Sequence, residues 1–230
     1  MYAIPPKEET QGLTEKYIGS WVKKNLNRDK YMIATKVAGP GMEYIRNGTN
    51  LSKEHVTKAI ETSLKRLNTD YIDLYQFHWP NRGSYMFRKN WNYNPALQNK
   101  ANTLANMEDC LAALQKQVDK GNIRHFGLSN ESAWGTAKWL RLSEDRGLPR
   151  VATIQNEYSL LCRLYDTDLA ELSVNEDVGL ITFSPLATGL LTGKYQNSAI
   201  PEGSRKSLSP DLGGRTTDRV WPAVDAYMAI

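Results

Sequence analysis

The chain has 230 residues, 40% of them hydrophobic, and its 29 Lys and Arg against 25 Asp and Glu give a net charge of +4. This length and composition allow one sizeable buried core, and we expect a single domain over residues 1–230. The charges form no run of like sign, which argues against a nucleic-acid-binding protein. No stretch reaches the length of a membrane helix, and the first residues do not resemble a signal peptide. We therefore expect a cytoplasmic protein without a nucleic-acid or membrane partner.

The spacing of cysteine and histidine argues against disulfides and metals. Cys110 and Cys162 are far apart and form no C-x-x-C pair, so we expect reduced thiols. His55, His78 and His125 have no H-x-x-x-H spacing, and the carboxylates form no ligand-like cluster. A G-x-S-x-G nucleophile elbow is also missing from the sequence. These patterns predict neither a metal enzyme nor a serine hydrolase.

Strand-like and helix-like segments alternate along the chain. The strand-like segments are about 31–37, 71–78, 123–129, 151–156 and 179–184, and the helix-like segments are about 12–26, 52–67, 103–120, 132–145 and 166–177. This alternation predicts a parallel sheet covered by helices, either an open doubly wound sheet or a closed barrel. No G-x-G-x-x-G follows an early strand, which weakens the open dinucleotide-binding fold.

The segment 52–67 carries consistent helix signals. Ser52 is a suitable N-cap, apolar residues recur at helical spacing from Val56 to Leu67, and Asn68 follows as a stop. We expect the apolar stripe of this helix to face the sheet.

Periodicity is lost between residues 79 and 102, where aromatic residues lie among Asn, Arg and Gly. The aromatic residues are Trp79, Tyr85, Phe87, Trp91 and Tyr93. Loops of this length are often functional lids or binding walls. We expect a substrate wall here, with Trp79 and Trp91 as the candidates for contacting an apolar or aromatic substrate.

Lys36 and His78 end two strand-like runs, at the edge where a (β/α)8 barrel assembles its chemistry. Hydride transfer to a carbonyl leaves negative charge on oxygen, so the site needs a proton donor and fixed hydrogen-bonding or positive groups. Tyr2 is a candidate donor, since a nearby ammonium lowers the phenol pKa from near 10. The alternatives are a frayed terminus for Tyr2, a snorkelling Lys36 and a hydrogen-bonded core histidine for His78.

A Gly- and Thr-containing loop follows the last strand-like segment, from Phe183 to Tyr195. Its backbone amides, its hydroxyl groups and Lys194 could together hold a pyrophosphate. It is not a Walker A loop, because Tyr195 stands where that motif has Ser or Thr. The alternative is a Gly-bearing turn between a strand and a helix.

Several strings in the same order resemble the aldo-keto reductase family. They are Ile33–Val37, Ser63–Leu67, Asp70–Tyr75, Tyr75–Pro80, Gly127–Asn130 and Phe183–Leu186, together with Tyr2. The resemblance implies a (β/α)8 barrel that reduces an aldehyde or ketone, a small-molecule carbonyl substrate, with a nicotinamide cofactor. It implies that Tyr2 is the general acid, that Lys36 lowers the pKa of Tyr2, and that His78 orients the carbonyl.

The resemblance also implies a set of cofactor contacts. Phe183 would stack on the nicotinamide, because an aromatic face leaves the other ring face to the substrate. Ser129, Asn130 and Gln155 would bind the carboxamide. Ser184, Leu186, Gly189, Lys194 and Arg205 would reach the phosphates. NADPH is the expected cofactor by analogy, and the sequence does not separate NADP from NAD.

The family pattern extends beyond both ends of this chain. The family Asp stands about five positions before its Tyr, upstream of Met1, and a complete barrel takes about 250 residues or more. We therefore expect an incomplete barrel with about five of its eight strands. A native five-stranded fold is the alternative, and it would expose two parallel edges. The functional alternatives are a cofactor-binding regulatory subunit like the potassium-channel β subunits, or an inactive fragment. A homo-oligomer is compatible with the sequence.

Overall fold

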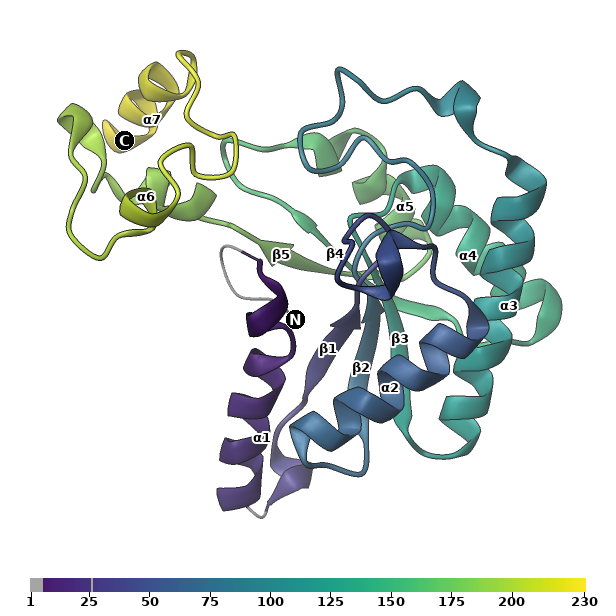
Figure 1. The fold of residues 1–230 in the computed structure, drawn as a ribbon. Helices are drawn as coiled ribbons and strands as arrows, with labels where there is room; N and C mark the ends of the chain where they lie inside the picture. The colour runs from purple at the N-terminus through teal and green to yellow at the C-terminus, as the bar shows by residue number, and fades with distance from the viewer. Residues whose placement is uncertain (1–5, 26) are drawn as a thin grey trace.

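The computed structural model describes residues 6–25 and 27–230. In this part of the chain, five strands form one parallel sheet in the order β1-β2-β3-β4-β5 (Figure 1). They are β1 (Ala34–Val37), β2 (Ile72–Phe77), β3 (Ile123–Ser129), β4 (Val151–Glu157) and β5 (Gly179–Phe183). The predicted α/β alternation is confirmed, and the arrangement is that of part of a (β/α)8 barrel.

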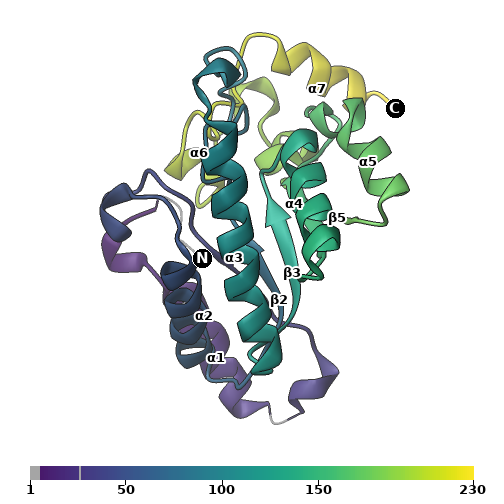
Figure 2. The same ribbon diagram turned by 90° about the vertical axis from the view of Figure 1, so that its right-hand side faces the viewer.

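Helices connect the strands, as parallel pairing requires. They are α2 (Lys53–Leu67), α3 (Lys100–Asp119), α4 (Ala133–Arg146) and α5 (Leu169–Asn175), while α1 (Leu13–Lys24) precedes β1. Helices α2, α3 and α4 lie over the same face of the sheet (Figure 2). Two further helices, α6 (Arg205–Leu208) and α7 (Val220–Met228), follow β5 and were not predicted from the sequence. No helix of the described residues is long and apolar enough to cross a membrane.

Helix α2 begins and ends as its sequence predicts. The Ser52 hydroxyl accepts from the backbone amide of His55, and the amide of Ser52 donates to Nδ1 of His55 at 3.2 Å, which forms a capping box. Asn68 adopts the left-handed conformation with φ of 51° and closes the helix. Val56 and Ile60 are fully buried, so the apolar stripe faces the core.

The helix-covered face of the sheet is filled with aromatic and aliphatic side chains. The Phe77 ring on β2 lies 5.1 Å from Phe126 on β3 and 5.5 Å from Trp139 on α4, in edge-to-face contacts. Strand residues two apart share a face, so these contacts assign the odd-numbered residues of β2 to the outer face. The even-numbered residues face the opposite, inner side.

The start of β2 is fixed by a buried carboxylate. Asp73 accepts from the amide of Ile33 at 2.9 Å and forms ion pairs with Arg28 at 2.6 Å and Arg124 at 3.1 Å. Burial alone would raise the pKa of Asp73, but the Ile33 amide and the Arg28 guanidinium outweigh that effect and hold it below the usual range. Asp73 therefore joins the backbone just before β1 to the start of β2 and helps to fix the register in which these two strands pair.

Candidate active site

The register of the sheet places the candidate residues on its inner face. Paired residues of neighbouring parallel strands point to the same side, and side chains alternate along each strand. The structure pairs Lys36 with Gln76, Ser129 with Gln155, and Glu157 with Phe183. The inner face at the carboxyl ends of the strands therefore carries Lys36, His78, Ser129, Gln155, Glu157 and Phe183.

His78 follows β2 and is buried, with 8% of its surface exposed. Its backbone amide donates to the carbonyl of Val37 at 2.9 Å, which continues the β1–β2 ladder. Burial, followed by nearby positive charge that includes Lys36, lowers the pKa of His78 to about 3. The imidazole is therefore neutral at ordinary pH and can donate a hydrogen bond without adding a second positive charge to the site.

Lys36 lies in β1, one step before the end of the strand. Burial lowers the pKa of its ammonium from the usual range. A partly desolvated ammonium acts more strongly on a neighbouring phenol than a solvated one does, because the local dielectric is lower. Tyr2, the predicted acid, lies outside the described residues.

Ser129 and Asn130 fix the ends of three strands. The Ser129 hydroxyl donates to the carbonyl of Gln155 at 2.7 Å, and the Asn130 side-chain amide donates to the carbonyl of His78 at 2.9 Å. Asn130 adopts a left-handed conformation with φ of 54°, which an Asn tolerates well. These two residues tie the end of β3 to the backbone of His78 on one side and to that of Gln155 on the other, whatever else they bind.

Trp79 and Trp91, both predicted to contact substrate, lie in different surroundings. The Trp79 ring lies 4.8 Å from the His78 ring, and its Nε1 donates to the carbonyl of Pro40 at 2.9 Å. The indole packs so closely on Gly39 that a Cβ there would meet it at 2.3 Å. Trp91 is 91% exposed. Trp79 thus borders the inner face, and Trp91 faces solvent.

The loop after Phe183 has the compact backbone expected of a turn that can receive an anion. Gly189 has φ of 101°, and a Cβ there would lie 2.8 Å from Cε of Lys194. The amides of Ala187 and Gly189 already donate to carbonyls within the loop. The groups suited to phosphates are therefore the Ser184 hydroxyl and the charged side chains of Lys194 and Arg205, both of which are exposed. This donor set fits an anionic dinucleotide.

An ion pair that the sequence did not suggest anchors the loop after β2. Arg82 and Glu131 form a bidentate pair with nitrogen–oxygen distances of 2.5 and 2.9 Å, and both side chains are buried. Gly135 makes this approach possible, because a Cβ there would lie 2.2 Å from Oε1 of Glu131. The pair joins the aromatic loop to the segment that leads into α4.

A second missed cluster lies at the end of β4. Oε1 of Glu157 accepts from Nη2 of Arg88 at 2.8 Å and from Nε of Arg215 at 2.9 Å. Arg88 belongs to the aromatic loop, and Arg215 precedes α7. No sequence motif marks these residues, since Arg88 and Arg215 lie 69 and 58 positions from Glu157 along the chain.

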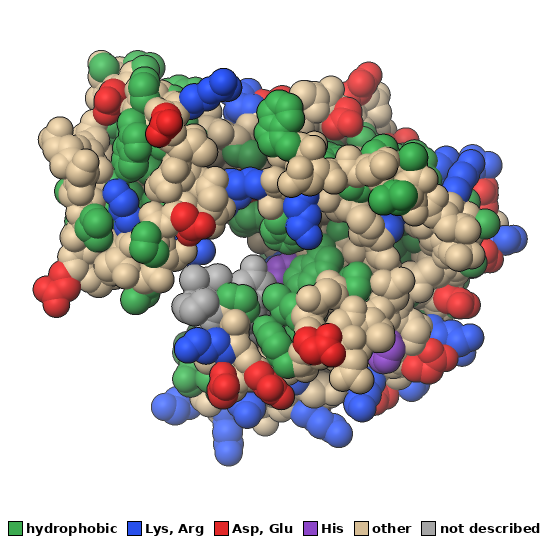
Figure 3. Space-filling model, turned by 45° about the horizontal axis from the view of Figure 1, so that its top comes forward, with side chains coloured by type: hydrophobic (Ala, Val, Ile, Leu, Met, Phe, Trp, Pro, Cys, Tyr) green, Lys and Arg blue, Asp and Glu red, His purple; other side chains and the backbone are tan. Residues whose placement is uncertain are grey.

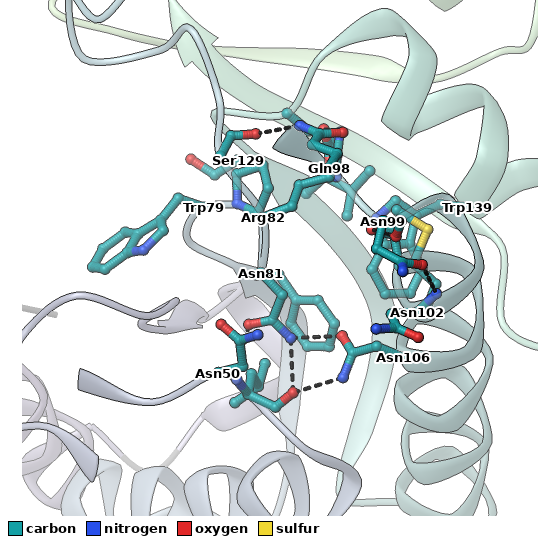
Figure 4. A pocket seen from close by; sticks show the side chains of 18 of the residues that line it. Asn50, Trp79, Asn81, Arg82, Gln98, Asn99, Asn102, Asn106, Ser129 and Trp139 are labelled. Atoms are coloured by element: carbon teal, nitrogen blue, oxygen red, sulfur yellow. Dashed lines mark hydrogen bonds and ion pairs between the residues drawn. The ribbon is translucent and has the colours of Figure 1, made fainter. Parts of the chain in front are cut away.

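A cavity of about 310 Å³ lies beneath the aromatic loop and is lined by many amide side chains (Figure 4). Its walls include Phe77 and Trp139, which belong to the helix-covered face. Asn81 and Asn106 bond to each other at 2.6 Å and to Leu51, so these amides are used in holding the loop. Trp79 and Ser129 also line this cavity, whereas Lys36 and His78 do not, so it reaches the border of the candidate site, and we do not place the chemistry there.

The molecule is hollowed at its strand ends (Figure 3). Lys and Arg side chains gather along one edge of the hollow, and a histidine side chain is visible beside it. Within the described residues, no group of three or more His, Cys, Asp or Glu side chains is arranged to hold a metal ion.

Comparison with known proteins agrees with this arrangement of strands. The sequence model of the aldo/keto reductase family matches residues 1–225, and the chain belongs to that family. It is 43% identical over 233 residues to the protein Tas of Escherichia coli K12, covering all of this chain and 66% of that protein.

More distant relatives differ in what their names say. The chain is 32% identical to an uncharacterized oxidoreductase, YrpG, of Bacillus subtilis, with 87% of this chain and 56% of that protein aligned. It is also 32% identical to a probable voltage-gated potassium channel subunit beta of Arabidopsis thaliana, with 90% of this chain and 55% of that protein aligned. The chain spans just over half to about two thirds of the length of these relatives.

Proposed function

We propose that the protein is an oxidoreductase that reduces aldehydes or ketones to alcohols with NADPH. The supporting observation is the single inner face on which Lys36, His78, Gln155 and Phe183 meet at the carboxyl ends of four strands. Chemistry in barrels of parallel strands is assembled at that edge. Membership of a family of reductases supports the same activity.

In this proposal Tyr2 donates the proton that the reduced carbonyl oxygen takes up. The Lys36 ammonium favours the phenolate form of Tyr2 and so lowers its pKa toward neutrality. Neutral His78 donates a hydrogen bond to the carbonyl oxygen and orients it toward the acid. The arrangement keeps one positive charge near the developing oxyanion, because His78 does not titrate near neutral pH.

Residues of β3, β4 and β5 would hold the cofactor, which supplies a hydride when bound. Ser129, Gln155 and Phe183 share the inner face of the sheet. In this proposal the side chains of Gln155, Ser129 and Asn130 would bind the carboxamide, and the Phe183 ring would stack on the nicotinamide. Lys194 and Arg205 offer positive charge for the phosphates. The expectation of NADP rather than NAD rests on analogy with the family.

The alternative is a cofactor-binding regulatory subunit in which turnover is slow or incidental. The observation that favours it is the similarity to a protein named as a potassium channel β subunit. Both functions require the same cofactor residues, so nucleotide binding does not separate them. The rate of carbonyl reduction separates the reductase from the regulatory subunit.

Titration with NADPH and an aldehyde assay test the proposal together. NADPH should quench the intrinsic tryptophan fluorescence saturably, and the protein should oxidise NADPH in the presence of 4-nitrobenzaldehyde. Tyr2→Phe should abolish most turnover and leave NADPH affinity nearly unchanged, because the hydroxyl acts in proton transfer. Tyr17→Phe, at an exposed position of α1, is the matched control and should change neither.

Each result separates the two candidates. Saturable NADPH binding without reduction of any aldehyde would favour the regulatory subunit. Absence of NADPH binding up to millimolar concentration would contradict both. Equal turnover by the wild type and Tyr2→Phe would remove Tyr2 from the acid role.

A further inference from the structure

The cluster at the end of β4 carries more positive than negative charge. Two guanidinium groups, Arg88 and Arg215, share one carboxylate, Glu157, and all their contacts to it go to the same oxygen, Oε1. The side chains of Glu157 and Arg215 are 14% and 10% exposed, so water screens this excess only partly. The cluster is therefore suited to one further anionic group.

Arg88 is the member of the cluster that can reach a ligand. Its side chain is 34% exposed. In the described part of the chain, Arg88 donates to Glu157 through Nη2, and Arg215 uses Nε, Nη1 and Nη2 on Glu157 and Leu212. A guanidinium has five N–H donors in a fixed fork, which matches a carboxylate in two-point contact. Arg88 therefore has donors to spare on its solvent side.

The cluster adjoins the candidate active site on two sides. Glu157 pairs with Phe183 in the sheet and shares its inner face. Arg88 directly follows Phe87, whose ring packs edge-on against Trp79 at 6.1 Å, and Trp79 in turn contacts His78. The same short stretch of loop thus contacts Trp79 through Phe87 and Glu157 through Arg88.

The backbone at this place is strained. Phe87 and Arg88 both adopt left-handed conformations, with φ of 57° and 62°. Non-glycine residues in this region are strained, and such strain concentrates at ligand-binding segments. The strained turn directs Phe87 to Trp79 and Arg88 to Glu157.

We propose that Arg88, held by Glu157 and supported by Arg215, binds a carboxylate of the substrate, so that the preferred substrates are aldehydes or ketones that also carry a carboxylate group. This inference rests on the proposed carbonyl reduction. The cluster is net positive, and Arg205 acts on Arg215 from nearby, so the cluster suits an anion, while the two-point fork of a guanidinium suits a carboxylate. Glu157 acts as a positioning residue, because it holds the two guanidinium groups and does not itself contact the substrate.

The test compares 4-carboxybenzaldehyde with its neutral methyl ester, methyl 4-formylbenzoate. The wild type should show kcat/KM at least tenfold higher for the acid than for the ester. Arg88→Gln, which can still hydrogen-bond Glu157, should reduce this preference at least tenfold, mainly through KM for the acid. Arg141→Gln, at an exposed arginine of α4, is the matched control and should leave the preference unchanged.

A binding measurement keeps the inference separate from turnover. With NADPH present, which cannot oxidise an alcohol, 4-carboxybenzyl alcohol should change the tryptophan fluorescence saturably, and Arg88→Gln should weaken this binding at least tenfold. Such binding without reduction of either aldehyde would contradict the proposed function and support the anion site. Reduction of both aldehydes with an unchanged preference in Arg88→Gln would overturn the inference alone. If the protein shows no reduction of either aldehyde and no binding of the alcohol, both the proposed function and the inference are overturned.

Two further outcomes would also overturn the inference. A tenfold loss of NADPH affinity in Arg88→Gln, with the substrate preference intact, would assign Arg88 to the cofactor. Inhibition of 4-carboxybenzaldehyde reduction by inorganic phosphate but not by benzoate would assign the site to a phosphate.

Discussion

At the scale of single residues, burial shapes the chemistry of the site. The first cause of the lowered pKa is desolvation both at Lys36 and at His78. The two residues nevertheless end in different states at neutral pH. His78 has lost its charge, because its ordinary pKa is already close to 7, whereas the ordinary pKa of Lys36 is far above it. The same desolvation therefore leaves His78 as a neutral hydrogen-bond donor and Lys36 as a cation.

This buried histidine should make folding stability depend on pH. The imidazole titrates at its ordinary pKa of 6.5 in the unfolded chain and at about 3 in the folded one. Between these values the unfolded state binds a proton that the folded state does not, so stability falls as the pH decreases below 6.5. Urea unfolding at pH values from 7 down to about 4.5 should show this slope, and His78→Gln should reduce it.

The matched control is His125→Gln, at an exposed position of β3. It should keep the slope of the wild type. A slope that is the same in His78→Gln and the wild type would show that His78 does not carry the proton-linked part of the stability.

At the scale of elements, local sequence patterns predicted the strands and helices well. The strand periods and the caps of α2 depend on residues close together in sequence, such as Ser52, His55 and Asn68, so the chain itself contains the signal. Boundaries were less well predicted: β1 begins at Ala34 rather than about residue 31, and α3 begins at Lys100 rather than about residue 103. Intrinsic helix or strand propensity changes little over a few residues, so tertiary contacts determine where each element begins.

The cap of α2 gives a direct test of these local signals. Ser52→Ala removes the hydroxyl that accepts from the amide of His55, so one amide of the first turn loses its partner. The expected loss is about 1 kcal/mol of unfolding free energy, measured by urea denaturation. Thr57→Ala, on the exposed side of the same helix, should change stability by less than about 0.5 kcal/mol. Equal effects of the two substitutions would show that the cap is not the source of the stability.

At the scale of the whole molecule, the sequence patterns alone did not predict which residues meet. Lys36 and His78 were predicted as site residues from their places at strand ends, and the register puts them on one face. The roles proposed for them, for Tyr2 and for the cofactor residues came from the family resemblance and stay predictions. The pairing of Glu157 with Arg88 and Arg215 could not have been predicted, because it depends on loops that meet only in the folded chain.

The Arg82–Glu131 pair is the long-range contact whose loss should be easiest to measure. Glu131→Gln leaves a buried guanidinium without a charged partner, and we expect a loss of about 3 kcal/mol of unfolding free energy. Amide hydrogen exchange should also become faster over residues 83–99, because the loop loses its attachment to the segment before α4. Both changes are measured on the same purified variant.

Glu108→Gln is the control, because Glu108 forms an exposed ion pair with Arg146. Its expected cost is below about 1 kcal/mol, with exchange over residues 83–99 unchanged. Similar costs for Glu108→Gln and Glu131→Gln would mean that burial of the Arg82 pair adds no stability.

The order of the strands in the sheet also bears on how the chain assembles during synthesis. Each strand from β2 to β5 pairs with the strand that was made just before it. A growing polypeptide can therefore add one strand and its helix at a time to a sheet that already exists, and chains generally begin to fold from the N-terminal side while still on the ribosome. The Glu157 cluster is an exception, because it waits for Arg215, made long after Arg88 and β4. The five-stranded sheet would thus leave the ribosome before the residue that completes the Glu157 cluster.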